Sequence, residues 1–353
     1  MVTEARTQPV IPIRRRIGST AVPVVGLLLV LAVLLWLGVN LVKAPDDFFQ
    51  IFLIGLSNGA LYGLVALGYT LVYGILGLIN FAHGDVFMLG GMISVTLVLS
   101  VFSLEESAPL GSLIPAILAC LAVAMGICGL LNASIERIAY KPLRSAPRLA
   151  PLITAIGVSF ILQDVGLIWK GPAYVAAPRT LPHGEIFSIG SVSYTWDRLI
   201  VLLITVPVLL GLMWLVRYTR QGKAMRATAQ DKDAAAMMGI DVNRTISFTF
   251  LIAGALAGTA GVVYAFYFTN VRFDTGFQLG LIAFTAAVLG GIGNLPGAVL
   301  GALLIGLIQA FNEGLAWRAP GSTWTTTIVF SILILILVFR PQGLLGERTP
   351  EGG

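Results

Sequence analysis

The feature that most constrains the fold is a continuous apolar tract at residues 50–102, whose only charged side chain is Asp85. One crossing of a lipid bilayer takes about 20 apolar residues, so this tract is long enough to cross twice and must turn near its middle. Turn-forming residues lie there, in a glycine- and asparagine-containing run at 77–85. A second overlong tract, at 277–311, is interrupted in the same way by a glycine-rich run at 290–297.

Composition places the rest of the chain in a membrane as well. Of its 353 residues, 57% are hydrophobic and 11% are charged, whereas soluble domains carry about 25% charged residues. The basic pI does not indicate a nucleic-acid-binding protein, because the basic residues follow the loops between apolar segments and form no stripe. Six further spans are predicted, at 22–42, 113–131, 151–169, 199–216, 246–268 and 324–339. The predicted fold class is an all-α polytopic membrane protein of about ten transmembrane segments, each broken tract counting as two.

Loop charge predicts the orientation of these spans. Most of the 22 Lys and Arg residues lie in segments that are cytoplasmic if the N-terminus is cytoplasmic, as the positive-inside rule requires. Both termini are therefore predicted to be cytoplasmic. The first span is predicted to be retained, because it is long for a signal peptide and no small-residue cleavage site follows it. On the other side, residues 170–198 have strand- and turn-forming character and are predicted to form a small extracytoplasmic platform.

The longest polar interval, residues 217–245, contains a predicted short helix at Asp231–Gly239. Asp231 can cap its N-terminus, Asp233 lies favourably in its first turn, and Gly239 can end it in a left-handed conformation. Two turns of isolated helix are marginal in water. We therefore interpret this helix as a contact element for a cytoplasmic partner. The alternative is a connecting loop with ordinary positive-inside charge.

The two interruptions are alike in sequence. Leu-Gly-Leu-Ile followed by Asn80 in the first parallels Leu-Gly-Gly-Ile, then Asn294, in the second. Paired interruptions of long apolar segments indicate internal repeats with a transport path between them, and their exposed backbone must face protein or a watery cavity. The alternative is a pair of tight loops at the membrane surface. The residues expected at the pathway are Asn80, His83, Asp85, Gly290, Gly291 and Asn294.

Charged residues within spans usually have functional roles. Asp164, beside Gln163 in the span 151–169, is predicted to be the single clearly intramembrane carboxylate. A proton-coupled secondary carrier would normally use several such groups, so that alternative has only Asp164 to draw on.

The sequence has no nucleotide, metal or cofactor motif. Gly222-Lys223 is followed by Ala224, so the chain has no P-loop of its own. Its only histidines, His83 and His183, have no metal-ligand spacing. No cofactor is predicted.

One catalytic pattern occurs, since residues 55–59 match G-x-S-x-G. With His83, Ser57 would make an intramembrane serine hydrolase, but the pentapeptide lies in a continuous apolar helix and not at a strand-to-helix turn. The alternative is close helix packing, which small residues at four-residue spacing permit. This spacing recurs in Gly55/Gly59/Gly63, Gly254/Gly258 and Gly297/Gly301. Cys120 and Cys128, about 12 Å apart along one helix, are also predicted to be packing residues.

Several longer motifs carry a family resemblance. They are NFAHGD at 80–85 with MLG at 88–90, IERIAYKPLR at 135–144, ITAIGVS at 153–159, the segment 222–244, and FTAAVLGGIGNLPGA at 284–298. Together they resemble the LivH-type permeases of branched-chain amino acid ABC importers, over about residues 50–345. The resemblance implies a multi-pass permease subunit of the bacterial inner membrane, without an ATPase site of its own.

That family works with a homologous second permease subunit, two ABC ATPase subunits and an extracytoplasmic substrate-binding protein. The implied substrate is a branched-chain amino acid, with urea or a short-chain amide as the alternative. The implied organisation is an N-terminal extension with an additional first span at 1–48, a permease domain at 49–345 and a cytoplasmic tail at 346–353.

The short helix is similar to the EAA-type coupling loop of ABC permeases. Asp replaces the usual Glu, and the downstream Leu-Pro of that loop is missing. The resemblance implies a cytoplasmic coupling helix that contacts an ATPase. The residues implied in coupling are Arg226, Asp231, Asp233, Ala234, Ala235 and Gly239.

Overall fold

The computed structural model describes residues 21–346 except 107, 145, 148 and 183. The predicted cytoplasmic extension before residue 21 and the tail beyond residue 346 lie outside the described residues. The chain divides into two compact units, Met1–Pro45 and Asp46–Gly353. The first contains α1 (Ala21–Lys43), whose apolar side chains, such as Leu34 and Leu35, are exposed. This is the surface expected of a helix that lies in lipid.

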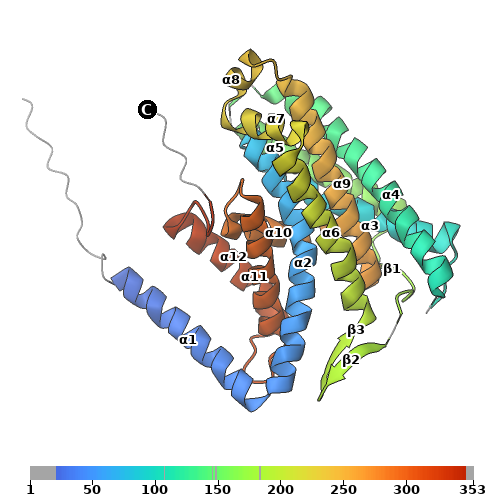
Figure 1. Cartoon of the computed structure of the whole chain (residues 1–353), viewed down its shortest axis with the longest axis vertical. Coiled ribbons are helices and arrows are strands. Elements are labelled where there is room, and N and C mark those ends of the chain that lie inside the picture. The colour runs from blue at the N-terminus through green and yellow to red at the C-terminus, as the bar shows by residue number, and fades with distance from the viewer. Residues whose placement is uncertain (1–20, 107, 145, 148, 183, 347–353) are drawn as a thin grey trace, which may run out of the picture. The chain divides into compact units, whose positions relative to one another are not determined.

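The rest of the described chain is mostly helical (Figure 1). Its helices are α2 (Pro45–Leu76), α3 (Ala82–Thr96), α4 (Leu110–Ile135), α5 (Leu149–Lys170), α6 (Trp196–Tyr218), α7 (Arg220–Gln230), α8 (Lys232–Met237), α9 (Val242–Phe268), α10 (Thr275–Gly290), α11 (Leu295–Gly314) and α12 (Ser322–Phe339). The π-helical turns η1 (Leu97–Val101) and η2 (Glu136–Tyr140) extend α3 and α4, and a 3-10 turn, η3 (Lys141–Leu143), follows η2. The strands are β1 (Val175–Ala176), β2 (Glu185–Ile189), β3 (Val192–Thr195) and β4 (Asn270–Val271).

The predicted polytopic all-α fold is confirmed. Eight helices of the described chain are long and apolar enough to cross a membrane, namely α2, α3 with η1, α4 with its extension, α5, α6, α9, α11 and α12. Shorter apolar helices are α10 and the part of α1 at Val30–Lys43. Both overlong tracts are split where the sequence predicted, between α2 and α3 and between α10 and α11.

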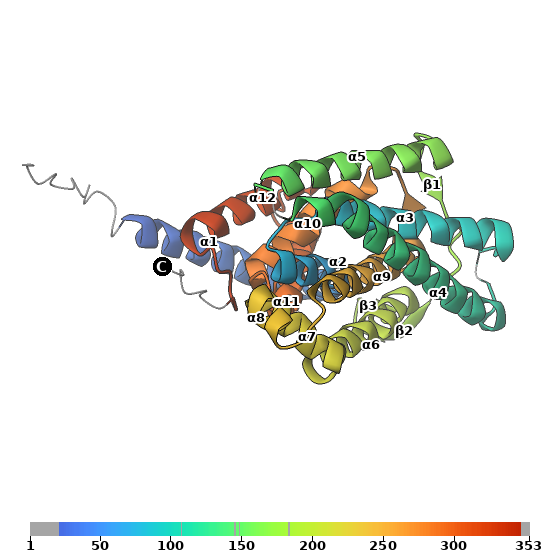
Figure 2. The same ribbon diagram turned by 90° about the horizontal axis from the view of Figure 1, so that it is seen from above.

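Burial separates the helices of the second unit into inner and outer ones. Helices α2 and α9 are mostly buried, whereas few residues of α5, α6 and α12 are buried. Figure 2 shows α2 and α9 running through the middle of this unit, with α5, α6 and α12 on its outside. Because α2 is apolar on all sides, it is suited to a core position and not to a boundary with water.

Glycines set the closest helix contacts, as predicted. A Cβ on Gly59 would lie 2.7 Å from the Cα of Leu303, so α2 and α11 approach backbone to backbone. A Cβ on Gly254 would lie 2.3 Å from the carbonyl oxygen of Cys128, which brings α9 onto α4. Cys120 and Cys128 are buried and unpaired, which fits their predicted packing role.

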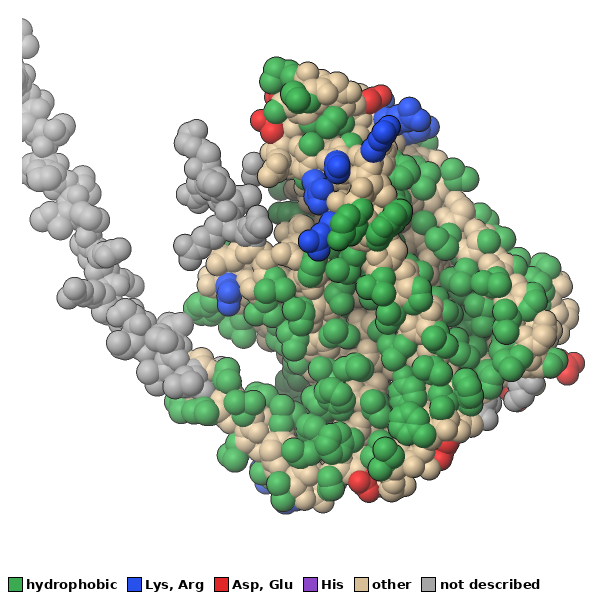
Figure 3. Space-filling view, in the orientation of Figure 1, with side chains coloured by type: hydrophobic (Ala, Val, Ile, Leu, Met, Phe, Trp, Pro, Cys, Tyr) green, Lys and Arg blue, Asp and Glu red, His purple; other side chains and the backbone are tan. Residues whose placement is uncertain are grey.

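The two ends of the second unit differ in character. Helices α7 and α8 lie at one end and the β2–β3 hairpin at the other (Figure 1). On the face shown in Figure 3, most Lys and Arg side chains gather at the α7–α8 end, while hydrophobic side chains cover the flanks. This distribution is the one expected of a protein whose flanks contact lipid.

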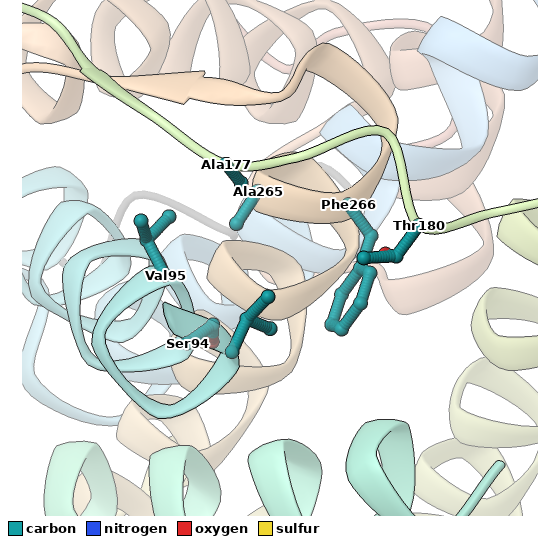
Figure 4. Close-up of a pocket in the computed structure, with 7 residues that line it drawn as sticks. Ser94, Val95, Ala177, Thr180, Ala265 and Phe266 are labelled. Atoms are coloured by element: carbon teal, nitrogen blue, oxygen red, sulfur yellow. The ribbon is translucent and has the colours of Figure 1, made fainter. Parts of the chain in front are cut away.

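Strands β1, β2 and β3 lie where the platform at 170–198 was predicted, and β4 comes from the segment after α9. β2 pairs antiparallel with β3, and the hairpin contacts the start of α2 through a hydrogen bond from the Ser193 amide to Gln50 Oε1 (3.0 Å). β1 pairs with β4, with Val175 opposite Val271. The loop after β1 covers α3 and α9, where Ala177 lies beside Ala265 and Thr180 beside Phe266, with no room for water between them (Figure 4).

Candidate functional site

The first interruption, residues 77–81 between α2 and α3, is called break 1 here. Gly77 has a φ of +69°, a left-handed conformation that ends α2 at low cost because glycine has no Cβ. The backbone is non-helical from there to Asn80, and α3 begins at Ala82 without a side-chain cap. Break 1 therefore depends on tertiary contacts to keep its shape.

Asn80 makes the main side-chain contact of break 1. It is buried, and its Oδ1 accepts a hydrogen bond of 2.7 Å from the Tyr140 hydroxyl in η2. Its Nδ2 has no partner among the described residues. Sequence reasoning had no signal for the Tyr140 contact, because the two residues are separated by 60 positions.

His83, in the first turn of α3, is fully buried. Its ring lies edge-on to Tyr69, with 4.9 Å between centroids, and fills the space left by the missing side chain of Gly68. Neither ring nitrogen has a hydrogen bond of good geometry among the described residues, although the Val65 backbone is a weak partner. The His83 imidazole is therefore a polar group in the membrane region that can still form a hydrogen bond.

Asp85 is the buried carboxylate of the inner helices. Its side chain is fully buried, and Oδ2 accepts a hydrogen bond from the Ser159 hydroxyl of α5, which in turn accepts one of 3.2 Å from Gln163. Oδ1 has no hydrogen-bond partner by the same geometric standard. Since a buried charge without full pairing is costly, Asp85 is a candidate for a functional role.

The prediction that Asp164 is the single intramembrane carboxylate was wrong. Asp164 lies on the exposed side of α5, whereas Asp85 and Glu136 are fully buried. The prediction failed because α3 begins as early as Ala82, which draws Asp85 into the bundle instead of leaving it at a turn.

The second interruption, residues 291–294 between α10 and α11, is called break 2. Gly291 and Gly293 both have positive φ, +110° and +94°. Asn294 caps α11, since its Oδ1 accepts a hydrogen bond of 2.9 Å from the Gly297 amide. A Cβ on Gly290 would lie 1.9 Å from the Gly297 carbonyl oxygen, so the two helices touch backbone to backbone.

A segment near the C-terminus, residues 340–346, closes break 2 and is called the closing segment. The amides of Leu344 and Leu345 donate to the carbonyls of Leu289 (2.8 Å) and Gly290 (3.0 Å). Asn294 Nδ2 donates to the Leu345 carbonyl (2.8 Å). Carbonyls that the end of α10 would leave unpaired are thereby satisfied.

The two breaks are neighbours. A Cβ on Gly74, near the end of α2, would lie 3.6 Å from the Cα of Gly293. The rings of Phe81 and Phe284 lie 6.2 Å apart. The structure thus brings the six predicted pathway residues into two adjacent interruptions, with His83 and Asp85 following break 1 inside α3.

The hydrolase alternative is contradicted. The Ser57 hydroxyl donates to the Leu53 carbonyl of its own helix (3.1 Å). His83 lies against Gly68, eleven residues further along α2, or about 16 Å of helix rise. The two side chains cannot act on one another.

The predicted short helix is α8, and its local design is as expected. Asp231 Oδ1 accepts hydrogen bonds from the amides of Asp233 (2.9 Å) and Ala234 (3.0 Å). Gly239 follows the helix with a φ of +81°. Ala235 is buried, whereas Met237 and Met238 are 82% and 83% exposed. Two large apolar side chains exposed at the polar α7–α8 end of the unit indicate a contact surface for another molecule.

Helix α7 was missed by sequence reasoning. Thr219 caps it, accepting a hydrogen bond of 3.0 Å from the Gly222 amide, and a threonine before this polar segment is the signal that would have found it. Arg226 lies exposed on α7 and donates to the Arg217 carbonyl (3.3 Å). An open cleft of about 680 Å³ lies between α7 and the ends of α4 and α9, lined in part by Arg137, Gln221 and Arg244.

Comparison with known proteins agrees with this architecture. Residues 51–338 match the family described as branched-chain amino acid transport system / permease component. The high-affinity branched-chain amino acid transport system permease protein BraD of Pseudomonas aeruginosa is 39% identical, over 84% of this chain and 95% of its own length. The corresponding LivH of Escherichia coli K12 is 37% identical, over 86% of this chain and 97% of its own. The autoinducer 2 import system permease protein LsrD of Salmonella paratyphi B is 26% identical, over 86% of each. No solved structure matches the chain.

Proposed function

The chain belongs to the branched-chain amino acid transport system permease family, and from this premise we propose that it is the membrane subunit of an ATP-driven importer of branched-chain amino acids in the inner membrane. The two relatives of highest identity named above carry that substrate in their names. The relative named for autoinducer 2 is less similar, at 26% identity. Urea or a short-chain amide is the alternative substrate.

The importer would contain a homologous second permease subunit, two ABC ATPase subunits and an extracytoplasmic substrate-binding protein. The observation that carries this proposal is α8, a capped two-turn helix with Met237 and Met238 open, in a chain without a P-loop. Such a helix is marginal alone and is stabilised by docking. In this assignment α8 contacts an ATPase in the cytoplasm, and both termini are cytoplasmic.

Substrate would pass beside break 1, where Asn80, His83 and Asp85 carry buried polar atoms without full pairing. Gly290, Gly291 and Asn294 would border the same path from break 2. Cysteine at position 80 or 294 is expected to react with a small water-soluble thiol reagent in at least one transport state. The native Cys120 and Cys128 are buried, which keeps the background low. Complete protection of both positions in nucleotide-free and ATP-trapped protein would contradict the pathway.

The coupling proposal is tested by placing proline within α8. Ala235→Pro removes the amide that donates to the Asp231 carbonyl (3.1 Å), and proline in a helix interior costs about 3 kcal/mol. Leucine uptake is expected to be lost while the protein remains in the membrane. Normal ATP-driven uptake by this variant would contradict the proposal.

Lys232→Pro is the matched control. Lys232 is the first residue of α8, where proline is well tolerated, and Asp231 before it is already extended (φ −153°, ψ 113°). Uptake by this variant is expected to stay close to that of the unmodified protein. Transport that persists without ATP in vesicles would instead favour a secondary carrier.

A further inference from the structure

We infer that η2 links the coupling helix to the pathway: Glu136 and Tyr140 hold break 1 in register with the start of α9, so that a movement of α8 reaches Asn80. The inference rests on the proposed function. It concerns the segment IERIAYKPLR at 135–144, to which the proposed function assigns no role.

The first link joins α8 to α9. The amides of Gly239 and Ile240 donate to the carbonyls of Ala236 (3.0 Å) and Ala235 (3.1 Å), which ties the connection to the end of α8. Asp241 then caps α9 by accepting from the Arg244 amide (2.9 Å). Since few residues separate the two helices and these are hydrogen-bonded, a displacement of α8 displaces the start of α9.

The second link joins the start of α9 to η2. Ser247 donates to Glu136 Oε2 (2.6 Å), and Glu136 Oε1 pairs with Arg144. Arg144 also donates to Asn243 Oδ1 (2.6 Å). Glu136 is fully buried. Separating Glu136 from Ser247 or from Arg144 would leave its buried charge incompletely paired. The start of α9 and η2 are therefore expected to move together.

The third link joins η2 to break 1. Tyr140, the last residue of η2, is fully buried, contacts the Phe250 ring of α9 (5.7 Å between centroids) and donates to Asn80 Oδ1 (2.7 Å). Short π-helical turns within helices are frequent at functional sites. Here the π-helical turn η2 has Glu136 at one end and Tyr140 at the other. Glu136 contacts the start of α9, which is linked to α8, and Tyr140 contacts break 1.

Break 1 is suited to receive such a movement. Its backbone is non-helical, Gly77 is not crowded by other atoms, and α3 has no side-chain cap. Among the described residues, the Tyr140 hydroxyl is the hydrogen-bond partner of the Asn80 side chain. Because a hydrogen bond is lost once its atoms separate beyond about 3.5 Å, a small shift of η2 either carries break 1 with it or releases it.

Tyr140→Phe tests the link, because it removes only the hydroxyl. In proteoliposomes containing the whole complex, leucine taken up per ATP hydrolysed is expected to fall about tenfold, the factor that one buried hydrogen bond is worth, while the rate of ATP hydrolysis is retained. Tyr62→Phe is the matched control: Tyr62 is equally buried and donates to Gln309 Oε1 (2.6 Å), between α2 and α11. This control is expected to lose similar thermal stability without any change in leucine per ATP.

An unchanged ratio of leucine to ATP in Tyr140→Phe, equal to that of Tyr62→Phe, would overturn the inference. If Tyr140→Phe does not assemble, the double variant Ser247→Ala/Asn243→Ala decides, since it removes both contacts of α9 in the second link, at a half-buried and an exposed residue. Its ratio is expected to fall in the same direction, and an unchanged ratio would overturn the inference equally. Failure of the unmodified complex to couple uptake to ATP would instead contradict the proposed function.

Discussion

Break 1 and break 2 interrupt two long apolar tracts with nearly the same residues, yet the structure completes them in different ways. At break 2, Asn294 caps α11 and the closing segment satisfies the carbonyls of Leu289 and Gly290. At break 1, no side chain of the described residues caps α3, and buried polar atoms of Asn80, His83 and Asp85 have no hydrogen-bond partner among those residues.

The difference shows that an interruption of an apolar tract has no fixed role. Satisfied backbone and tight glycine contacts make break 2 a rigid joint. Incomplete pairing makes break 1 sensitive to any new polar partner, because a buried polar group gains most from a hydrogen bond it lacks. A substrate passing through the protein would be such a partner.

The largest effect is expected from a methyl group at break 2. In Gly290→Ala the new Cβ would lie 1.9 Å from the Gly297 carbonyl oxygen, and overpacking of this kind costs roughly 3 kcal/mol. In Gly77→Ala no atom of the described residues lies within 4 Å of the new Cβ, and only the φ of +69° is unfavourable, at a cost of about 1–2 kcal/mol. Thermal unfolding in detergent measures both, and a milder effect of Gly290→Ala would break the comparison.

Asp85→Asn should reduce function more than stability. The amide keeps the shape of the side chain and can still pair with Ser159, but it cannot form a charge-assisted hydrogen bond with a passing ammonium group. Leucine uptake per folded complex is expected to fall about tenfold, as for loss of one such bond. Unchanged uptake in a normally assembled Asp85→Asn complex would show that transport does not need the negative charge of Asp85.

Asn294→Ala should reduce stability more than function. It removes the cap on Gly297 and the contact with Leu345, and loss of an N-cap costs about 1 kcal/mol. The melting temperature is expected to fall, while uptake per folded complex falls less than for Asp85→Asn. A larger loss of uptake than of stability would make break 2 as functional as break 1.

The smallest effect is expected from Asp164→Asn, outside both breaks. Asp164 is exposed on α5 and belongs to neither break, so its charge is expected to have no part in the pathway. Uptake and its pH profile should be unchanged. Abolished transport in an assembled complex that hydrolyses ATP would assign Asp164 an ionised role.

The sequence was sufficient for features that depend on local chemistry. Tract length and glycine runs located both breaks, and the pair Asp231 and Gly239 located α8, because caps and left-handed glycines act within a few residues. The depth of Asp85, the Tyr140–Asn80 hydrogen bond and the closing segment depend on how helices pack. Residues 51 to 60 positions apart make the last two contacts, and no local pattern announces them.

The closing segment has a consequence for biosynthesis. A chain is made from its N-terminus, so α10 and α11 are complete before residues 344 and 345 exist to pair with Leu289 and Gly290. Until then the carbonyls of Leu289 and Gly290 lack these hydrogen bonds in the nascent hairpin, and only water or the insertion machinery can supply donors for them. A segment translated later thus pairs with an earlier turn, and maturation of the subunit can be complete only after the ribosome has passed residue 345.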